Sequence, residues 1–191
     1  MVEIARATFA MEIVNWGLIS CASIANKNVR AMELSWNSNL VAVASRSLEK
    51  AMHFASDNNL SKSVRLYSSY QDLLDDPNIH AVYLPLPTTL HLEWAIKVAN
   101  SKKHLLIEKP AAVDAGELTL IIEACRCNNV LFMDGVMFMH HDRTNLLRNC
   151  LRDPFAGEVL FDLFIHETVC PDMTQFVLQY DSAKFVDVDP N

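Results

Sequence analysis

The residues best suited to chemistry are Glu108, Lys109 and Pro110, which directly follow the short apolar run 104–107. A run of this length predicts a buried parallel strand, and open α/β sheets bind their ligands beyond the carboxyl ends of such strands. Pro110 fixes its own φ angle and favours an extended Lys109, so the ammonium should project from the strand end. We therefore expect Lys109 to contact a ligand.

The elements that position this lysine alternate regularly along the chain. Apolar runs of strand length recur between stretches that have one apolar helical face. Strands are predicted at residues 13–19, 40–44, 64–67, 81–84, 104–107 and 130–133, and helices at residues 24–34, 48–58, 70–74, 90–100 and 117–127. This order predicts an α/β fold with a parallel sheet covered on both faces and right-handed crossovers.

Composition limits the classes of partner. The chain of 191 residues is 51% hydrophobic and 20% charged, and it has no apolar stretch of the roughly 18 to 20 residues that span a membrane. A net charge of −7 without a basic block argues against nucleic acid and anionic membranes as partners, and the short tract of Lys102 and Lys103 is expected at a solvated helix end.

Five cysteines without zinc spacing, together with no secretory signal, favour free thiols and a cytoplasmic location. Adjacent His140 and His141 would diverge on a helix, so we expect no metal site.

The loop after the first strand is the expected phosphate site, because a helix amino terminus offers unpaired N–H groups and a positive dipole end. Its candidate residues are Gly17, Ser20, Cys21, Ala22 and Ile24. A dinucleotide fingerprint has glycine where Ser20 and Ala22 stand, yet small side chains still let the backbone approach a pyrophosphate. The alternative is a tight turn without a ligand.

The second predicted strand ends at Ser45 and Arg46, where an NAD enzyme carries an acidic residue for the ribose hydroxyls. A guanidinium beside a serine hydroxyl suits a 2′-phosphate, because arginine binds phosphate through two hydrogen bonds and stays charged. This pair favours NADP, with NAD as the alternative cofactor. Otherwise Arg46 begins an exposed helix with Glu49 and Lys50.

The fourth predicted strand ends in a proline-rich turn that contains Leu86, Pro87 and Thr88. The prolines stop the strand, and Thr88 and Thr89 are placed to cap the next helix. A helix start at this edge could contact the ribose or the nicotinamide of a cofactor. His91, in the first turn of that helix, belongs either to the cofactor site or to the capping structure.

Several motifs occur together in a fixed order: Gly17-x-x-Ser-x-Ala, Ala-Ser-Arg46, Leu-Pro-Leu-Pro87-Thr-Thr-Leu-His91, Glu108-Lys109-Pro110 and Met133-Asp-Gly135. Over about residues 12 to 165 the chain resembles the Gfo/Idh/MocA oxidoreductases, most closely the plant-type branch related to dihydrodiol dehydrogenase and D-xylose 1-dehydrogenase. The resemblance implies a Rossmann-type, doubly wound domain that binds NAD(P). It also implies that Glu108 and Lys109 lie at the cofactor, with Lys109 as the catalytic residue beside the substrate hydroxyl.

The resemblance further implies hydride transfer to or from a hydroxyl carbon of a sugar or cyclic polyol. Family members are longer and carry a second, open-sheet domain for substrate and dimer contacts. We therefore expect an extension at 1–11, the Rossmann domain at 12–139, and a truncated start of an α+β substrate and dimerisation domain at 140–191.

Three hypotheses about function remain open. The first is an NADP-dependent oxidoreductase, of which this chain is a truncated form that binds cofactor with doubtful turnover. The second is a non-catalytic remnant that forms a homodimer or pairs with a full-length relative through a strand predicted at 159–165. The third is a Rossmann-like domain that binds no nucleotide.

Overall fold

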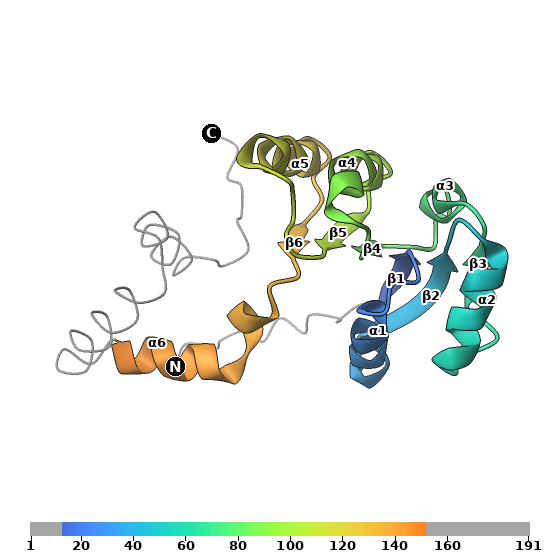
Figure 1. The fold of residues 1–191 in the computed structure, drawn as a ribbon, viewed down its shortest axis with the longest axis horizontal. Coiled ribbons are helices and arrows are strands. Elements are labelled where there is room, and N and C mark those ends of the chain that lie inside the picture. The colour runs from blue at the N-terminus through green and yellow to red at the C-terminus, as the bar shows by residue number, and fades with distance from the viewer. Residues whose placement is uncertain (1–12, 152–191) are drawn as a thin grey trace, which may run out of the picture. The chain divides into compact units, whose positions relative to one another are not determined.

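The computed structural model describes residues 13–151, and the chain divides into two units after Val136. The first unit contains a parallel sheet with the strand order β3-β2-β1-β4-β5-β6 (Figure 1). Its strands are β1 (Val14–Ile19), β2 (Ser38–Ala44), β3 (Arg65–Tyr67), β4 (Ala81–Leu84), β5 (His104–Ile107) and β6 (Phe132–Asp134). This is the order of a doubly wound Rossmann sheet, so the predicted fold class is confirmed.

Helices cover both faces of this sheet (Figure 1). They are α1 (Ala25–Leu34), α2 (Leu48–Asp57), α3 (Tyr70–Leu74), α4 (His91–Asn100) and α5 (Ala115–Cys127). Helices α1 and α2 pack on one face around Leu18 and Val43, and helices α3 to α5 pack on the other around Ile19 and Ala44. Neighbouring residues of one strand thus serve opposite cores, because strand side chains alternate between faces. The predicted strands and helices of this unit are all present, with boundaries that differ by a few residues.

Gly17, in the middle of β1, is required for packing. A Cβ atom at this position would lie 2.8 Å from Leu73 Cδ2 and 3.1 Å from Ile79 Cδ1. We expect Gly17→Ala to lower the free energy of unfolding by about 1–3 kcal/mol, since overpacking forces neighbours to shift. Urea denaturation measures this loss. Gly116→Ala is the control, because a Cβ there meets only the side chain of Asp114 and adds helix propensity; equal losses in both variants would contradict the packing role.

Lys103 corrects the expectation of a solvated basic tract. Only 4% of it is exposed, and its Nζ donates hydrogen bonds to the carbonyl oxygens of Asp76 (2.8 Å) and Ile79 (3.0 Å). Burial lowers the pKa of Lys103 more than the nearby carboxylates of Asp76 and Asp75 raise it. Lys102, in contrast, is exposed as expected and donates to Asn128 Oδ1. The error arose because the two carbonyls that accept from Lys103 precede strand β4, 24 or more residues away.

The second unit is described as far as residue 151. It contains a 3₁₀ turn, η2 (Met137–His140), and helix α6 (Asp142–Leu151). The predicted extension 1–11 and the strand predicted at 159–165, on which pairing with another chain depended, lie outside the described residues.

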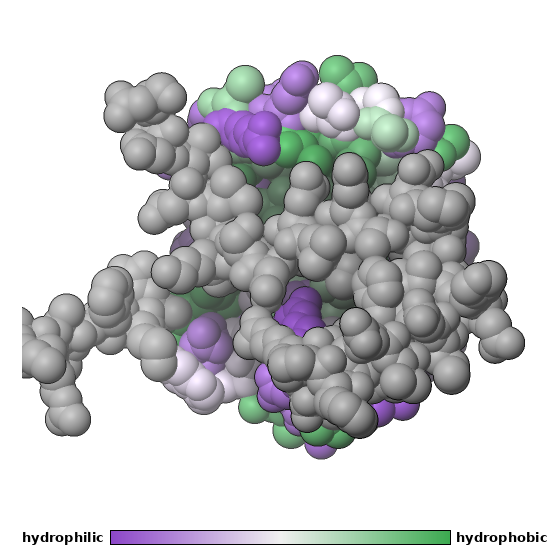
Figure 2. All heavy atoms as spheres, turned by 90° about the vertical axis from the view of Figure 1, so that its left-hand side faces the viewer, coloured by the Kyte–Doolittle hydropathy of each residue, from purple (hydrophilic) through white to green (hydrophobic). Residues whose placement is uncertain are grey.

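Strand β6 and the region of α5 carry several exposed apolar side chains, namely Val113, Leu120, Leu131 and Met133. In the coloured part of Figure 2, hydrophobic and hydrophilic residues lie next to each other. Such a mixture is ordinary for a protein surface. None of the described helices is both long and apolar enough to cross a membrane.

Candidate functional site

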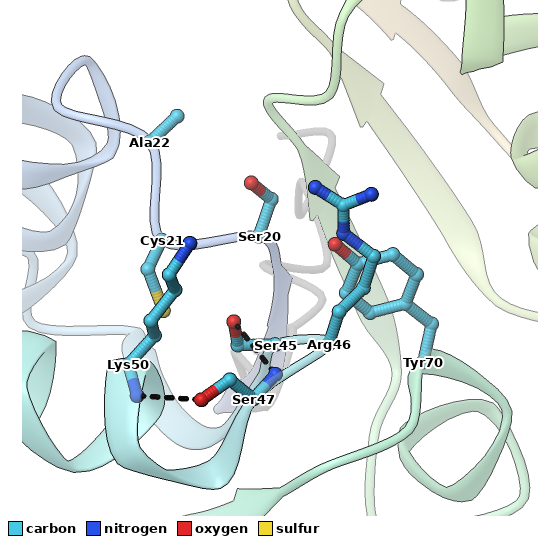
Figure 3. A pocket seen from close by; sticks show the side chains of 8 residues that line it. All are labelled: Ser20, Cys21, Ala22, Ser45, Arg46, Ser47, Lys50 and Tyr70. Carbon is cyan, nitrogen blue, oxygen red and sulfur yellow. Dashed lines mark hydrogen bonds between the residues drawn. The ribbon is translucent and has the colours of Figure 1, made fainter.

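A pocket lies where the chain leaves the carboxyl ends of β1 and β2. It has a volume of about 440 Å³ and is lined by Ser20, Cys21, Ala22, Ser45, Arg46, Ser47, Lys50 and Tyr70 (Figure 3). Strand β1 pairs with β2 on one side and with β4 on the other, so the strand order reverses beside this pocket. Ligands of doubly wound sheets bind at such a switch point.

The loop between β1 and α1 forms one wall of the pocket. Ser20 has a φ angle of 91°, a backbone conformation that favours glycine, which explains why fingerprints of this type carry glycine at this position. Ile24 is the N-cap of α1 and makes no side-chain cap, and the first turn holds no acidic residue. The first turn of α1 thus has no carboxylate of its own to offset the positive end of the helix dipole. Ala25, fully buried, lets the helix start lie close to the sheet.

The loop between β2 and α2 forms the opposite wall. Ser45 is buried, and its Oγ accepts a hydrogen bond from the Ser47 amide at 3.5 Å. Ser47 is the N-cap of α2, and its Oγ accepts from the Lys50 amide at 3.4 Å. These bonds fix the start of α2 and place Arg46 and Lys50 at the pocket, where the Arg46 guanidinium lies beside the Tyr70 ring and Lys50 extends toward Cys21 (Figure 3).

Tyr70 closes the pocket from helix α3. Its ring packs edge-on against Trp94 of α4, with centroids 5.0 Å apart, and Lys97 Nζ lies 4.2 Å from the centroid of the Trp94 ring. Burial raises the pKa of Tyr70, although the charge of Arg46 acts in the opposite direction. The Tyr70 hydroxyl therefore stays protonated at neutral pH and can donate a hydrogen bond into the pocket.

The lining residues combine two cations with hydroxyl groups, and no carboxylate is among them. Burial raises the pKa of the Cys21 thiol above 9.0, more than a hydrogen bond with Ser45 and the charge of Lys50 lower it. Cys21 is thus a neutral thiol at neutral pH and adds no negative charge. Guanidinium, ammonium and hydroxyl donors around one space suit a phosphate group, whose oxygens accept charge-assisted hydrogen bonds.

The predicted residues after β4 lie at the same edge of the sheet. Thr88 belongs to a 3₁₀ turn, η1 (Thr88–Leu90), and the N-cap of α4 is Leu90, without a side-chain hydrogen bond. The predicted capping by Thr88 and Thr89 is therefore wrong, because the chain continues through η1 directly into α4. Pro87 is exposed, whereas Leu86 is buried.

His91 links two loops of this edge. It is only 1% exposed, and its Nε2 lies 2.8 Å from the Leu86 carbonyl oxygen while its Nδ1 lies 3.1 Å from that of Ala111. The loop after β4 is thereby tied to the segment that follows Pro110. Of the two predicted roles, the structure favours a supporting one, since so buried a ring has little surface to offer a ligand.

Glu108 and Lys109 point in different directions at the end of β5. Lys109 is exposed, as its position before Pro110 predicts, and the Lys109–Pro110 peptide bond is cis. Glu108 turns inward, where its Oε1 accepts a hydrogen bond from the Tyr83 hydroxyl at 2.6 Å. Glu108 therefore anchors the end of β5, whereas the exposed side chain of Lys109 is accessible to a ligand.

The structure gathers a large part of the predicted site but not all of it. Ser20, Cys21, Ala22, Ser45 and Arg46 line one pocket, and their contact with a cofactor stays a prediction. Gly17 instead lies within β1, where it packs against Leu73 of α3. Ile24 is the N-cap residue of α1 and does not line the pocket.

Three lining residues were missed, namely Ser47, Lys50 and Tyr70. The spacing of Ser47 and Lys50 could have suggested these two residues, because an N-cap serine binds the backbone amide three residues later and so fixes the first turn of the helix. Tyr70 gave no such signal, because its place depends on how α3 packs.

Comparison with known proteins is consistent with this geometry. Residues 14–136 match the model of the GFO_IDH_MocA family, described as an oxidoreductase family with an NAD-binding Rossmann fold. The chain is 35% identical over 147 residues to a dTDP-3,4-didehydro-2,6-dideoxy-alpha-D-glucose 3-reductase of Saccharopolyspora spinosa, covering 76% of this chain and 43% of that protein. It is 30% identical over 148 residues to a trans-1,2-dihydrobenzene-1,2-diol dehydrogenase of Xenopus tropicalis, covering 76% and 44%.

Among solved structures, the 3-ketoreductase KijD10 of Actinomadura kijaniata, in complex with NADP and TDP-benzene, is similar with a TM-score of 0.68 and 30% identity. The match covers 73% of this chain and 42% of KijD10. The chain thus spans less than half the length of the curated relatives that it matches. The similarity to a dihydrodiol dehydrogenase agrees with the resemblance found in the motifs.

Proposed function

We propose that this chain, which belongs to the Gfo/Idh/MocA oxidoreductase family, binds NADP through its Rossmann domain. The observation that carries the proposal is the pair of cations, Arg46 and Lys50, among hydroxyl groups and without a carboxylate in the pocket lining. An NAD site carries an acidic residue at the end of the second strand, which would repel a 2′-phosphate. Here the donor set fits that phosphate, with Arg46 as the bidentate partner.

The remaining parts of the cofactor would follow the edge of the sheet. The pyrophosphate would lie at the amino terminus of α1, where Ser20 and Ala22 leave the backbone accessible. The nicotinamide end would lie near the ends of β4 and β5, where Pro87 and Lys109 are exposed. The related KijD10 structure contains NADP, which supports this choice of cofactor.

For the whole protein we propose oxidoreductase activity on a sugar or cyclic polyol. The cofactor supplies the hydride acceptor or donor at the nicotinamide C4. The exposed ammonium of Lys109 would donate a hydrogen bond to the oxygen of the reacting carbon and hold it in place. The sugar reductase and diol dehydrogenase relatives support this substrate class.

We also propose that the protein acts in the cytoplasm and that its protein partner is a second copy or a full-length relative. The odd number of cysteines supports a reducing compartment, and Cys21, Cys125 and Cys127 are free thiols. Light scattering of the purified chain tests the partner: a mass of two chains supports a homodimer, and one of a single chain contradicts it.

Titration with NADPH and with NADH tests the cofactor proposal. Trp94 packs against Tyr70 at the pocket, so its fluorescence should respond to binding. We expect a dissociation constant at least about tenfold lower for NADPH, since one charged hydrogen bond contributes about 1.5–3 kcal/mol. Equal affinity for the two cofactors would refute the 2′-phosphate role, and no response to NADPH at millimolar concentration would refute cofactor binding altogether.

A further inference from the structure

Tyr83 places a polar group at an unusual position in the sheet. It lies in the centre of β4, is fully buried, and packs among the apolar side chains under α1 and α2. Its hydroxyl donates a hydrogen bond of 2.6 Å to Glu108 Oε1 at the end of the neighbouring strand. Such a short bond to a carboxylate is charge-assisted and among the stronger hydrogen bonds in proteins.

The carboxylate of Glu108 is also held by other groups. Its Oε2 accepts a hydrogen bond from the backbone amide of Lys109 at 3.3 Å, and its Oε1 accepts a long one from Asn28 Nδ2 at 3.5 Å. A Cβ atom on Gly135 would lie 3.3 Å from Glu108 Cδ and from its Cα, so the chain after β6 closes the remaining side. Tyr83 and the backbone of Lys109 therefore meet on one carboxylate.

The tyrosine remains a donor under all ordinary conditions. Burial raises the pKa of Tyr83 far above its usual value of 10.0, and the neighbouring Glu108 raises it further. Since the phenol keeps its proton, its hydrogen bond can hold Glu108 in one orientation. The apolar packing around the ring leaves this side chain little freedom to turn away.

We propose that Tyr83 is a positioning residue which, through Glu108, fixes the backbone of Lys109 at the nicotinamide end of the cofactor site. The inference rests on the proposed binding of NADP. In this arrangement Glu108 links the sheet to Lys109 and leaves the contact with the cofactor to Lys109. Asn28 connects the same carboxylate to α1, the helix assigned to the pyrophosphate.

The test compares two ligands in the variant Tyr83→Phe, which removes only the hydroxyl group. NADPH spans the whole proposed site, whereas adenosine 2′,5′-bisphosphate carries the 2′-phosphate and lacks the nicotinamide. We expect the dissociation constant of NADPH to rise about three- to tenfold and that of the bisphosphate to stay within about twofold. Lys109→Ala should show the same selective loss.

Tyr67→Phe is the matched control, because the Tyr67 hydroxyl also donates to a carboxylate, that of Asp76, outside the pocket. It should leave the ratio of the two dissociation constants unchanged. A second variant, Glu108→Gln, should reproduce the selective loss, and its combination with Tyr83→Phe should add little, because both changes act on one linkage.

Each other outcome overturns the inference. Equal weakening of both ligands by Tyr83→Phe would indicate a general loss of structure, and unchanged binding of both would show that the hydroxyl positions nothing. If the unmodified chain binds the bisphosphate and NADPH with equal affinity, Lys109 has no contact to be positioned and this inference alone fails. If the chain binds neither ligand, the proposed function fails as well.

Discussion

Replacing Arg46 with alanine is expected to weaken NADPH binding by about 10- to 150-fold and to leave NADH binding within about twofold. The two cofactors differ only in the 2′-phosphate, and Arg46 enters the pocket at the end of β2, where this group would lie. Loss of a charge-assisted hydrogen bond to an ionised group accounts for the size of the effect. Titration of the purified variant with each cofactor, followed by tryptophan fluorescence, measures both constants.

Two further variants make this prediction specific. Arg46→Lys keeps the charge but loses the planar fork, so NADPH affinity should fall between that of the unmodified chain and that of Arg46→Ala. Arg30→Ala controls for net charge, since Arg30 is an exposed arginine of α1 whose guanidinium contacts Glu33 outside the pocket. Equal losses of NADPH and NADH affinity in Arg46→Ala would contradict the assignment of Arg46 to the 2′-phosphate.

The architecture was predictable because its signals are local. Most strands of the first unit contain a short apolar run, the helices between them have an apolar face, and a parallel sheet follows from their alternation. The same rule places every βα loop at one edge of the sheet. For this reason Ser20, Arg46 and Lys109, which are far apart in sequence, could be assigned to one edge before the structure was known.

Contacts between residues that lie far apart in the sequence could not be predicted from it. Lys103 resembles a solvated lysine until the chain before β4 brings two carbonyl oxygens to its ammonium. Tyr83 resembles one more apolar strand residue, and only the pairing of β4 with β5 brings its hydroxyl to Glu108. Tyr70 joins the pocket through its packing against Trp94. Each of these contacts joins residues from different elements, whereas the patterns used for prediction lie within one.

The carboxylate of Asp76, which precedes β4, is buried and is expected to contribute to the stability of the first unit. Its side chain is 4% exposed and forms an ion pair of 2.7 Å with Arg65. Tyr67 and the amide of Asn78 donate further hydrogen bonds to it, each of 3.0 Å. The Nε of Arg65 is buried without a hydrogen-bond partner among the described residues, whereas the Arg65 side chain as a whole is 41% exposed, so water can solvate part of its charge.

Asp76→Ala is therefore expected to lower the free energy of unfolding by about 1–3 kcal/mol, because it removes the acceptor of the Arg65 ion pair and of the hydrogen bonds from Tyr67 and Asn78. Urea denaturation at neutral pH measures the loss. Asp75→Ala is the matched control. The Asp75 carboxylate is exposed and, among the described residues, accepts a side-chain hydrogen bond from Gln71 of α3, so the free energy of unfolding should change by less than about 0.5 kcal/mol. Similar losses in the two variants would show that the network contributes no specific stability.

The pH dependence of this loss provides an independent check on its origin. Burial by itself would raise the pKa of Asp76, but hydrogen bonds from Asn78 and Tyr67 and the charge of Arg65 outweigh it, and the pKa lies below 3.8. The unfolded chain therefore takes up this proton before the folded chain does, so the stabilising contribution is complete above pH 3.8 and is lost as the pH falls through the folded value. The difference in unfolding free energy between the unmodified chain and Asp76→Ala should accordingly be constant from neutral pH to about pH 5 and shrink below pH 3.8. A difference that stays constant in acid would assign the stabilisation to packing instead of to the ionised carboxylate.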